Sequence, residues 1–431
     1  MAILRPFRGI MYDPDRVDLA RVVAPPYDVI GPKDQQRYYQ QDPHNVVRLI
    51  AGEVRPSDSA EDNKYLRAAG FFEEWLRQGI LRQEAEPSIH MYRHDFVDPT
   101  TGDAHARQGI LGVVELEPFG RGILPHERTH ARAKADRLSL TRAVRANLSP
   151  IFCLYEDPRD EVHRLLEPYV DDRPRLSIET DDGDRHRVWS VRSPDAVQAL
   201  ASVLAASRLY VADGHHRYET ALNFQNKMRV EHPEAPPDAA FNFVLMLLVD
   251  VTDPGLVILP THRFVHDVAG FNADDLVASL EQRFALTKYP DRQGLFDALQ
   301  SGDDGHRLGA VLGSRQFSVD IPRPAGADPV SRLDVSVLHR EILDGLLGLP
   351  EAALEEERYV GYSRDLEAVL ERVDSGTAQA VFLLRPPAVS DVVAVAAAGQ
   401  VMPQKSTYFY PKPASGIVFN PLDPGIRIPA V

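Results

Sequence analysis

The sequence has a single cysteine, Cys153, among 431 residues. One thiol cannot form a disulfide within the chain, and its apolar neighbours favour a buried, inert thiol over a nucleophile.

Long apolar runs are also missing. The most apolar segment, 243–251, is interrupted by Asp250 and is too short to cross a bilayer. The N-terminal stretch MAILRPFRGIMYDPD has no apolar core of a signal peptide. These absences predict a cytoplasmic protein with no membrane partner.

Positive charge is scarce as well. The chain has 48 Lys and Arg residues against 63 Asp and Glu, a formal net charge of -15. An acidic surface repels phosphate backbones, so nucleic acid is excluded as a general partner. A small anionic ligand still fits wherever basic residues gather. The hydrophobic share of 44% is that of a globular protein, and the length predicts two or three domains.

Short apolar runs typical of strands alternate along the chain with segments whose apolar residues recur at helical spacing. This pattern predicts an α+β (mixed α/β) fold. The segment 156–187, rich in Asp and Arg, is expected to include exposed turns, and a domain boundary is expected near 265. Expected helices are 61–78, 136–146 (capped by Asp136), 197–206, 218–228, 273–284, 292–300, 332–346, 364–374 and 389–398. Expected strands are 22–24, 89–92, 108–116, 151–155, 209–212, 241–251, 285–288, 307–313, 316–321 and 379–384.

The segment HERTH at 126–130 matches the zinc-protease pattern H-E-x-x-H. In that pattern two histidines on one helical face bind the metal, and the glutamate acts as a base. Here the surroundings are basic: residues 121–145 hold seven basic and two acidic side chains, which opposes a divalent cation. Arginine forks suit phosphate, so an anion site is the favoured interpretation. A zinc site and a solvated surface helix remain alternatives.

A second polar segment, DGHHR at 213–217, follows the apolar strand expected at 209–212. A strand, a tight turn and a helix aim backbone N–H groups at an anion. Gly214 allows close approach of the backbone, and Asp213 has the oxygens that orient a histidine or bind Mg²⁺. The alternative is a capped helix with two exposed histidines.

The chain resembles the bacterial family called domain of unknown function 1015. The similarity spans nearly the whole chain and rests on APPYDVI at 24–30, LPHERT at 124–129, KADRLSL and RANLSPIF behind it, DGHHRYETAL at 213–222, LPTHR at 259–263 and MPQKSTYFYPKPASGIV at 402–418. His130 lies outside LPHERT, which makes the zinc match accidental. DGHHR also resembles a motif of the ParB/sulfiredoxin-like superfamily, including its free-serine kinases, where it binds nucleotide phosphates.

These resemblances imply a ParB-like phosphate-binding core over residues 1–265, with an insertion at about 31–205. The remainder, 266–431, is then a second α+β lobe whose tail folds back to the site. DGHHR is the only segment onto which residues of the small kinases can be carried over.

The function implied is phosphotransfer on a small hydroxyl substrate, with serine or phosphoserine the first choice and Mg²⁺ with ATP or ADP as cofactors. The direction, serine kinase or phosphoserine phosphatase, stays open, as does the oligomeric state. Candidate catalytic residues are Asp28, Glu127, Asp213, His215 and His216, with Asp213 also the candidate Mg²⁺ ligand. Candidate phosphate-binding residues are Gly214, Arg217, Arg128, Lys134, Arg137, Lys405 and Ser406. A non-catalytic nucleotide-binding regulator and a metallohydrolase using HERTH are the alternatives.

Overall fold

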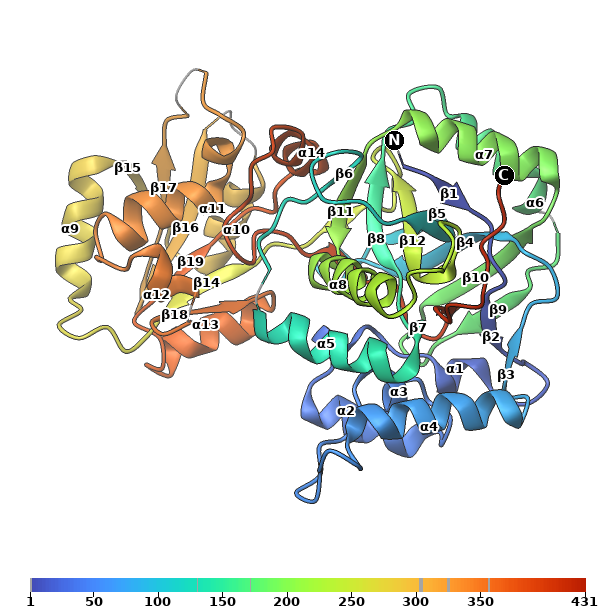
Figure 1. Cartoon of the computed structure of the whole chain (residues 1–431). Coiled ribbons are helices and arrows are strands. Elements are labelled where there is room, and N and C mark those ends of the chain that lie inside the picture. Colours follow the sequence, from blue (N-terminus) through green and yellow to red (C-terminus); the bar gives the residue numbers. More distant parts are fainter. Residues whose placement is uncertain (1, 130, 171, 302–304, 324–325, 356) are drawn as a thin grey trace. The chain divides into compact units, whose positions relative to one another are not determined.

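The structure is a computed structural model that describes residues 2–129, 131–170, 172–301, 305–323, 326–355 and 357–431. Contacts divide the chain into two compact units (Figure 1). Unit 1 comprises Met1–Pro125, Thr129–Val257 and Pro411–Val431. Unit 2 comprises His126–Arg128 and Ile258–Tyr410. The sequence predicts one boundary near 265, and the two units divide the chain at 125–126, 128–129, 257–258 and 410–411.

Unit 1 is built on a nine-stranded sheet of order β6-β11-β8-β12-β5-β4-β10-β9, with β1 paired to β5. Its central strands β8 and β12 are almost entirely apolar and buried, which is typical of strands covered on both faces. They pair in parallel, while most other pairs are antiparallel. The strands are β1 Leu4–Arg5, β4 Ile89–Val97, β5 Ala104–Glu115, β6 Ile123–Leu124, β8 Ile151–Tyr155, β9 Leu176–Glu179, β10 Arg185–Val191, β11 Leu209–Asp213 and β12 Phe243–Asp250.

Helices pack around this sheet and fill the unit 1 core. Leu200 and Leu204 of α7 and Leu166 of α6 are buried in one cluster with Met246 of β12. In Figure 1, α8 lies beside α5, and α5 beside α4. The helices are α1 Leu19–Val22, α2 Pro32–Gln41, α3 Val47–Ile50, α4 Lys64–Arg77, α5 Ala131–Val144, α6 Glu161–Val170, α7 Pro194–Ala206 and α8 His215–Glu231. Two short ladders complete the unit: β2 Ile10–Tyr12 with β3 Leu81–Gln83, and β7 Ala146–Asn147 with β21 Asn420–Pro421.

Two local predictions for unit 1 were wrong. The expected strand 22–24 is the end of α1 followed by an extended residue, Ala24, that makes only an isolated bridge with Ser415. Asp136 lies inside α5 and does not cap it. The segment 156–187 includes the expected exposed turns, at 158–159 and 181–182, and it also contains α6, β9 and part of β10. Its charged residues alternate with buried ones, as in strands with one wet face.

Unit 2 is built on a six-stranded antiparallel sheet of order β15-β17-β16-β19-β14-β18. Its strands are β14 His262–Val265, β15 Ala285–Lys288, β16 His306–Leu312, β17 Arg315–Ile321, β18 Val360–Ser363 and β19 Ala380–Leu383. Its helices are α9 Ala273–Arg283, α10 Arg292–Gln300, α11 Asp334–Val337, α12 Glu351–Glu355, α13 Leu366–Asp374 and α14 Val389–Ala397. Elsewhere in the chain, β13 Val257–Ile258 pairs with β20 Phe409–Tyr410 in a two-stranded ladder.

The mixed helix and sheet content confirms the predicted fold class. The helix expected at 332–346 is divided: α11 ends at Val337 and a π-helical segment, η4 Leu338–Asp344, follows. The ParB-like core with its insertion stays a prediction, although β4, β5 and β8 of the supposed insertion share one sheet with β11. Among the described residues, no helix is long and apolar enough to cross a membrane.

Candidate functional site

The DGHHR segment forms the turn between β11 and α8. Gly214 is the N-cap of α8 with φ 100°, a left-handed conformation that costs a side-chain-bearing residue energy. A Cβ at this position would lie 3.1–3.2 Å from the Arg217 guanidinium. Glycine is therefore favoured here for two reasons: the left-handed backbone, and the Arg217 side chain that lies against the position of a Cβ. α8 begins at His215, earlier than the helix start predicted at 218.

Charged side chains of alternating sign meet at this turn. Asp213 holds Lys412 through Oδ1, at 2.6 Å from Nζ, and Arg217 through Oδ2, at 2.5 Å from Nη2. Lys412 also pairs with Asp28, and Arg217 donates to the carbonyl oxygen of Pro150. We call Asp28, Lys412, Asp213 and Arg217 the unit 1 charge row. Sequence reasoning missed Lys412, although it lies in the same MPQKSTYFYPKPASGIV segment from which Lys405 and Ser406 were chosen.

Two members of the charge row, Asp213 and Lys412, are held in their charged forms. Burial opposes the charge on Asp213, but Lys412 and Arg217 outweigh it and hold the pKa of that carboxyl well below its usual range. Burial also opposes the charge on Lys412, and its two carboxylate partners raise the pKa of the amine above its usual value. Because both oxygens of Asp213 face cations, a Mg²⁺ ion does not fit at Asp213 in this arrangement.

The two histidines of DGHHR have different environments. His215 is 2% exposed, so the alternative interpretation with two exposed histidines is wrong for this residue. His216 is half-buried, and its carbonyl oxygen accepts a hydrogen bond of 2.7 Å from the Thr220 hydroxyl. Burial raises the pKa of Asp213, and His215 contributes with Lys412 and Arg217 to lowering it.

Two predicted phosphate-binding residues lie on α5, and both have acidic partners. Lys134 Nζ is 2.6 Å from Oε2 of Glu219, which lies on α8. Arg137 donates through Nε to Oδ2 of Asp136 at 2.8 Å, and its guanidinium carbon lies 3.9 Å from the centre of the Tyr27 ring. Tyr27 directly precedes Asp28 in the chain. These contacts connect α5 to α8 and to the segment that carries Asp28.

The other four predicted site residues belong to unit 2: Glu127, Arg128, Lys405 and Ser406. Arg128 is exposed, with Nη1 3.9 Å from Glu351 Oε1. Lys405 Nζ lies 4.0 Å from Glu357 Oε1. Ser406 is buried and donates to a backbone carbonyl of its own loop. That these four residues act with the DGHHR turn stays a prediction.

The zinc interpretation of HERTH needs a helix that the described chain does not form. β6 ends at Leu124 and α5 begins at Ala131, so His126 and Glu127 lie in an irregular segment. His126 is buried, and its Nε2 lies 2.9 Å from the Thr407 hydroxyl. The second histidine, His130, lies outside the described residues. The helical spacing on which the metallohydrolase alternative depends is therefore absent at 126–129.

A different group in unit 1 has the residue types of a metal site. Among the described residues, His94, Asp184 and His186 are the one such cluster, with one ligand atom each within 4.8 Å of the others. His94 on β4 and His186 on β10 are cross-strand partners, and His94 Nε2 lies 2.7 Å from Asp184 Oδ2. No local sequence pattern predicts this cluster, because the two histidines meet only through the pairing of β4 with β10.

The surroundings of this cluster oppose a cation. The buried Arg107 has Nη2 3.5 Å from His94 Nδ1, so its positive charge lies beside the ligands. A metal on Nε2 of His94 would leave a proton on Nδ1, facing another donor. Burial, together with the positive charges nearby, lowers the pKa of both histidines, that of His186 to about 3. Burial, with Asp182, raises the pKa of Asp184 to about 6. Neutral, hydrogen-bonded histidines are the favoured state.

Comparison with known proteins decides the family. A family described as "Protein of unknown function (DUF1015)" matches residues 4–336. The chain belongs to the DUF1015 family. The matched region includes DGHHR and LPTHR, and it ends before the segment that carries Lys412. No curated protein matches the chain significantly.

Solved structures similar to this DUF1015 chain share little sequence with it. A conserved hypothetical protein from Pyrococcus furiosus is 13% identical, with 68% of this chain and 89% of that chain covered at a TM-score of 0.34. A free serine kinase in complex with AMP is 13% identical, with coverages of 67% and 83% and a TM-score of 0.33. C-terminally truncated SbnI from Staphylococcus aureus is 11% identical, with coverages of 74% and 87% and a TM-score of 0.32. Scores this low carry no argument about activity.

Proposed function

We propose that the β11–α8 turn of unit 1 is a phosphotransfer site for a small hydroxyl substrate, with serine or phosphoserine as that substrate. The observation that carries the proposal is the unit 1 charge row at the start of a 17-residue helix. A helix N-terminus attracts phosphate through its N–H groups and dipole. Phosphoryl transfer depends mainly on positioning and charge neutralisation, which fixed cations provide.

Each member of the charge row has a role in this proposal. Asp28 is its most accessible carboxylate, with 37% of the side chain exposed, and it accepts the proton of the attacking hydroxyl. The hydroxyl oxygen forms the new bond to phosphorus as the bond to the leaving group breaks. Lys412 and Arg217 neutralise the oxygens of the transferred group, and Asp213 positions both cations. In the phosphatase direction water attacks, and serine leaves.

The nucleotide in this proposal comes from the resemblance of DGHHR to the ParB/sulfiredoxin-like motif, with ATP or ADP as phosphate donor or acceptor. Gly214 lets phosphate oxygens approach the backbone. Arg137 and Lys134 on α5 add further basic groups to the proposed site. No step of the proposal requires Mg²⁺ at Asp213, because both oxygens of that carboxylate already face cations.

The test follows phosphorus by NMR in the purified full chain. One arm contains phosphoserine with and without ADP or AMP, and the other contains serine with ATP or ADP, both in magnesium buffer. We expect phosphate or nucleotide signals to change in one arm, which also determines the direction. Asp28→Asn removes the base and should lower the rate by roughly 10²- to 10⁴-fold. Lys227→Ala, an exposed position on the same helix, should leave the rate unchanged.

Two outcomes would count against this function. If Asp28→Asn reacts as fast as the unaltered protein, Asp28 is not the base. If every arm stays silent while a nucleotide still binds, the protein is a nucleotide-binding regulator, the alternative raised by the sequence. The charges of the row already form ion pairs with one another. This second result would therefore favour a protein that binds a nucleotide without transferring its phosphate.

A further inference from the structure

Unit 2 contains a polar cavity of about 230 Å³. Its wall includes Thr261 and Arg263 of the LPTHR motif and Ser406 of the C-terminal segment, together with Arg323, Arg332 and Arg385. An apolar cavity of about 150 Å³ is enough to accommodate benzene, so a phosphate group with a few carbon atoms fits here. None of the roles proposed above uses Arg263, Arg323, Arg332 or Arg385.

Arg263 is a buried cation without a counter-ion in the described chain. Arg263 is 1% exposed. Among the described residues, its guanidinium donates hydrogen bonds only to backbone carbonyls, at 3.2 Å to Gln404 and 3.0 Å to Lys405 among others. Its Nε is buried and has no hydrogen-bond partner among the residues that the structure describes. Burying a charge without an opposite charge is costly. Burial also lowers the pKa of this guanidinium to about 10, in keeping with an uncompensated charge.

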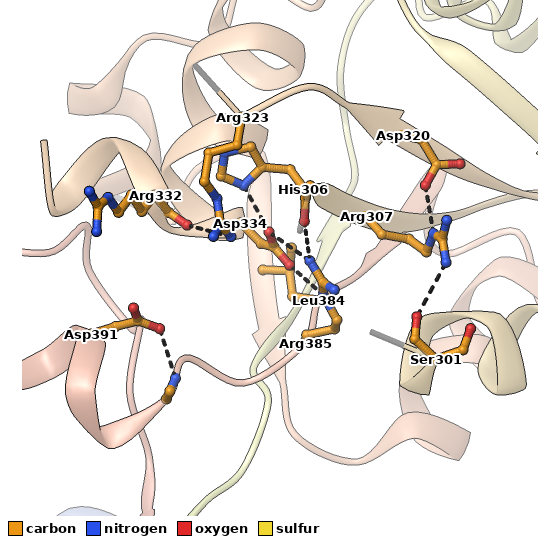
Figure 2. A network of polar contacts seen from close by, with 12 residues as sticks. Ser301, His306, Arg307, Asp320, Arg323, Arg332, Asp334, Leu384, Arg385 and Asp391 are labelled. Carbon is orange, nitrogen blue, oxygen red and sulfur yellow. Dashed lines mark hydrogen bonds and ion pairs between the residues drawn. The ribbon is translucent and has the colours of Figure 1, made fainter. Parts of the chain in front are cut away.

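Arg323 and Arg332 likewise contact carbonyls and no described carboxylate. Arg323 Nη2 lies 3.5 Å from the carbonyl oxygen of Arg332, and Arg332 Nε donates to the Ala327 carbonyl at 3.0 Å. Both residues are exposed, so their guanidinium groups are free to turn toward a ligand without breaking an ion pair in the described region. Figure 2 shows the Arg323 guanidinium between Asp334 and the carbonyl oxygen of Arg332, with the Arg332 side chain extending away from Asp334.

The two carboxylates of the cavity wall are already engaged. Asp334 accepts from Arg385 Nε at 2.9 Å and lies 2.9 Å from His306 Nδ1, and Figure 2 shows both side chains converging on it. Asp391 accepts from the backbone N–H of Ala388 at 3.0 Å, at the start of α14. Four arginines and two aspartates line the cavity, which leaves an excess of two positive charges on its wall.

We propose that this cavity, which we call the unit 2 arginine pocket, binds a small phosphate monoester. A phosphate monoester carries about −1.5 to −2 charges at neutral pH, which matches the excess on the wall. Planar guanidinium forks bind phosphate oxygens in pairs. The pocket is independent of the phosphotransfer site, and it stands if that function fails.

The test is calorimetric titration of the full chain with inorganic phosphate, and with succinate as a dicarboxylate of similar charge. We expect saturable phosphate binding, weakened roughly tenfold or more by each of Arg323→Gln and Arg332→Gln, because charge-assisted hydrogen bonds are lost. Both positions are exposed, so folding should be unaffected. Arg332→Lys keeps the charge but not the fork and should lose less. Arg340→Gln, an exposed arginine of unit 2 paired with Glu341 at 2.8 Å, is the matched control.

A further variant distinguishes phosphate binding in the arginine pocket from phosphate binding in unit 1. In Gly214→Val, which obstructs the β11–α8 turn, phosphate binding to the arginine pocket should persist. The proposal is overturned if phosphate does not bind, if binding survives in the combined Arg323→Gln and Arg332→Gln protein, or if it disappears in Gly214→Val. Binding of succinate in place of phosphate would overturn the assignment to a phosphate monoester.

Discussion

Lys412 in unit 1 and Arg263 in unit 2 are both buried cations, and their environments differ in one respect. Burial alone lowers the pKa of each. At Lys412 two carboxylates outweigh burial, and the pKa rises. At Arg263 the described hydrogen-bond acceptors are carbonyl groups, and burial lowers the pKa to about 10. An internal ion pair stabilises a fixed arrangement of charges, whereas an unpaired buried cation keeps its affinity for an anion from outside.

The largest effect should follow from removing the paired cation. Lys412→Met leaves Asp213 buried with Arg217 as its remaining cation and should lower the free energy of unfolding by roughly 3–5 kcal/mol. Urea denaturation of the full chain measures it. Lys405→Met is the matched control, because Lys405 is half exposed and 4.0 Å from Glu357, and its loss should hardly change stability. Equal effects in both variants would refute a special role for the Lys412 pairs.

Acid should destabilise the surroundings of the unpaired cation. Burial and the charge of Arg263 lower the pKa of His262 to about 4 and that of His339 to about 3. Unfolded histidine titrates near about 6.5. The folded state therefore binds fewer protons, and stability present above about pH 6.5 is lost as the pH falls toward these values. The loss is at most about 1.4 kcal/mol per pH unit for each histidine.

Urea unfolding across this pH range measures the slope. His339→Leu should flatten it, because one titrating group is removed. His163→Gln should leave it unchanged, since that side chain is 60% exposed. A slope that is the same in all three proteins would mean that the buried histidine does not control the acid response.

A smaller effect concerns the turn that holds Arg217. Gly214→Ala should cost roughly 1–2 kcal/mol for the left-handed backbone, and it should also displace the guanidinium and slow phosphotransfer. Gly120 has φ 95° and no atom within 4 Å of an added Cβ. Gly120→Ala should therefore have a similar cost in stability with normal activity. Normal activity in both variants would show that the contact between Gly214 and Arg217 is unimportant to the reaction.

The smallest effect is expected at Arg128. Its side chain is 69% exposed and 3.9 Å from Glu351, so Arg128→Ala should leave the urea midpoint unchanged. The same variant tests the sequence-based prediction that Arg128 binds phosphate. A fall in the phosphotransfer rate without a change in stability would support that role, and an unchanged rate would remove Arg128 from the site.

Local patterns in the sequence were sufficient for many elements. The strand at 285–288 and the helix at 292–300 were predicted with the bounds that the structure has, because their periodicity and caps are local. The segment DGHHR was recognised as a strand–turn–helix because a glycine and an apolar strand mark it. The helix expected at 332–346 failed, since no local pattern distinguishes a continuous helix from one with a π-helical turn.

By itself the sequence determined the mixed fold, the family resemblance and the turn that carries Asp213 and Gly214. Only the tertiary structure decided which charges meet. Lys412 reaches Asp28 from 384 residues away, His94 meets His186 through the pairing of β4 with β10, and the charge of Arg263 is left unpaired by burial in the described chain. Turns and periodicities are local properties of a chain. Ion pairs depend on how distant segments return to one another, which residue patterns within a single segment do not contain.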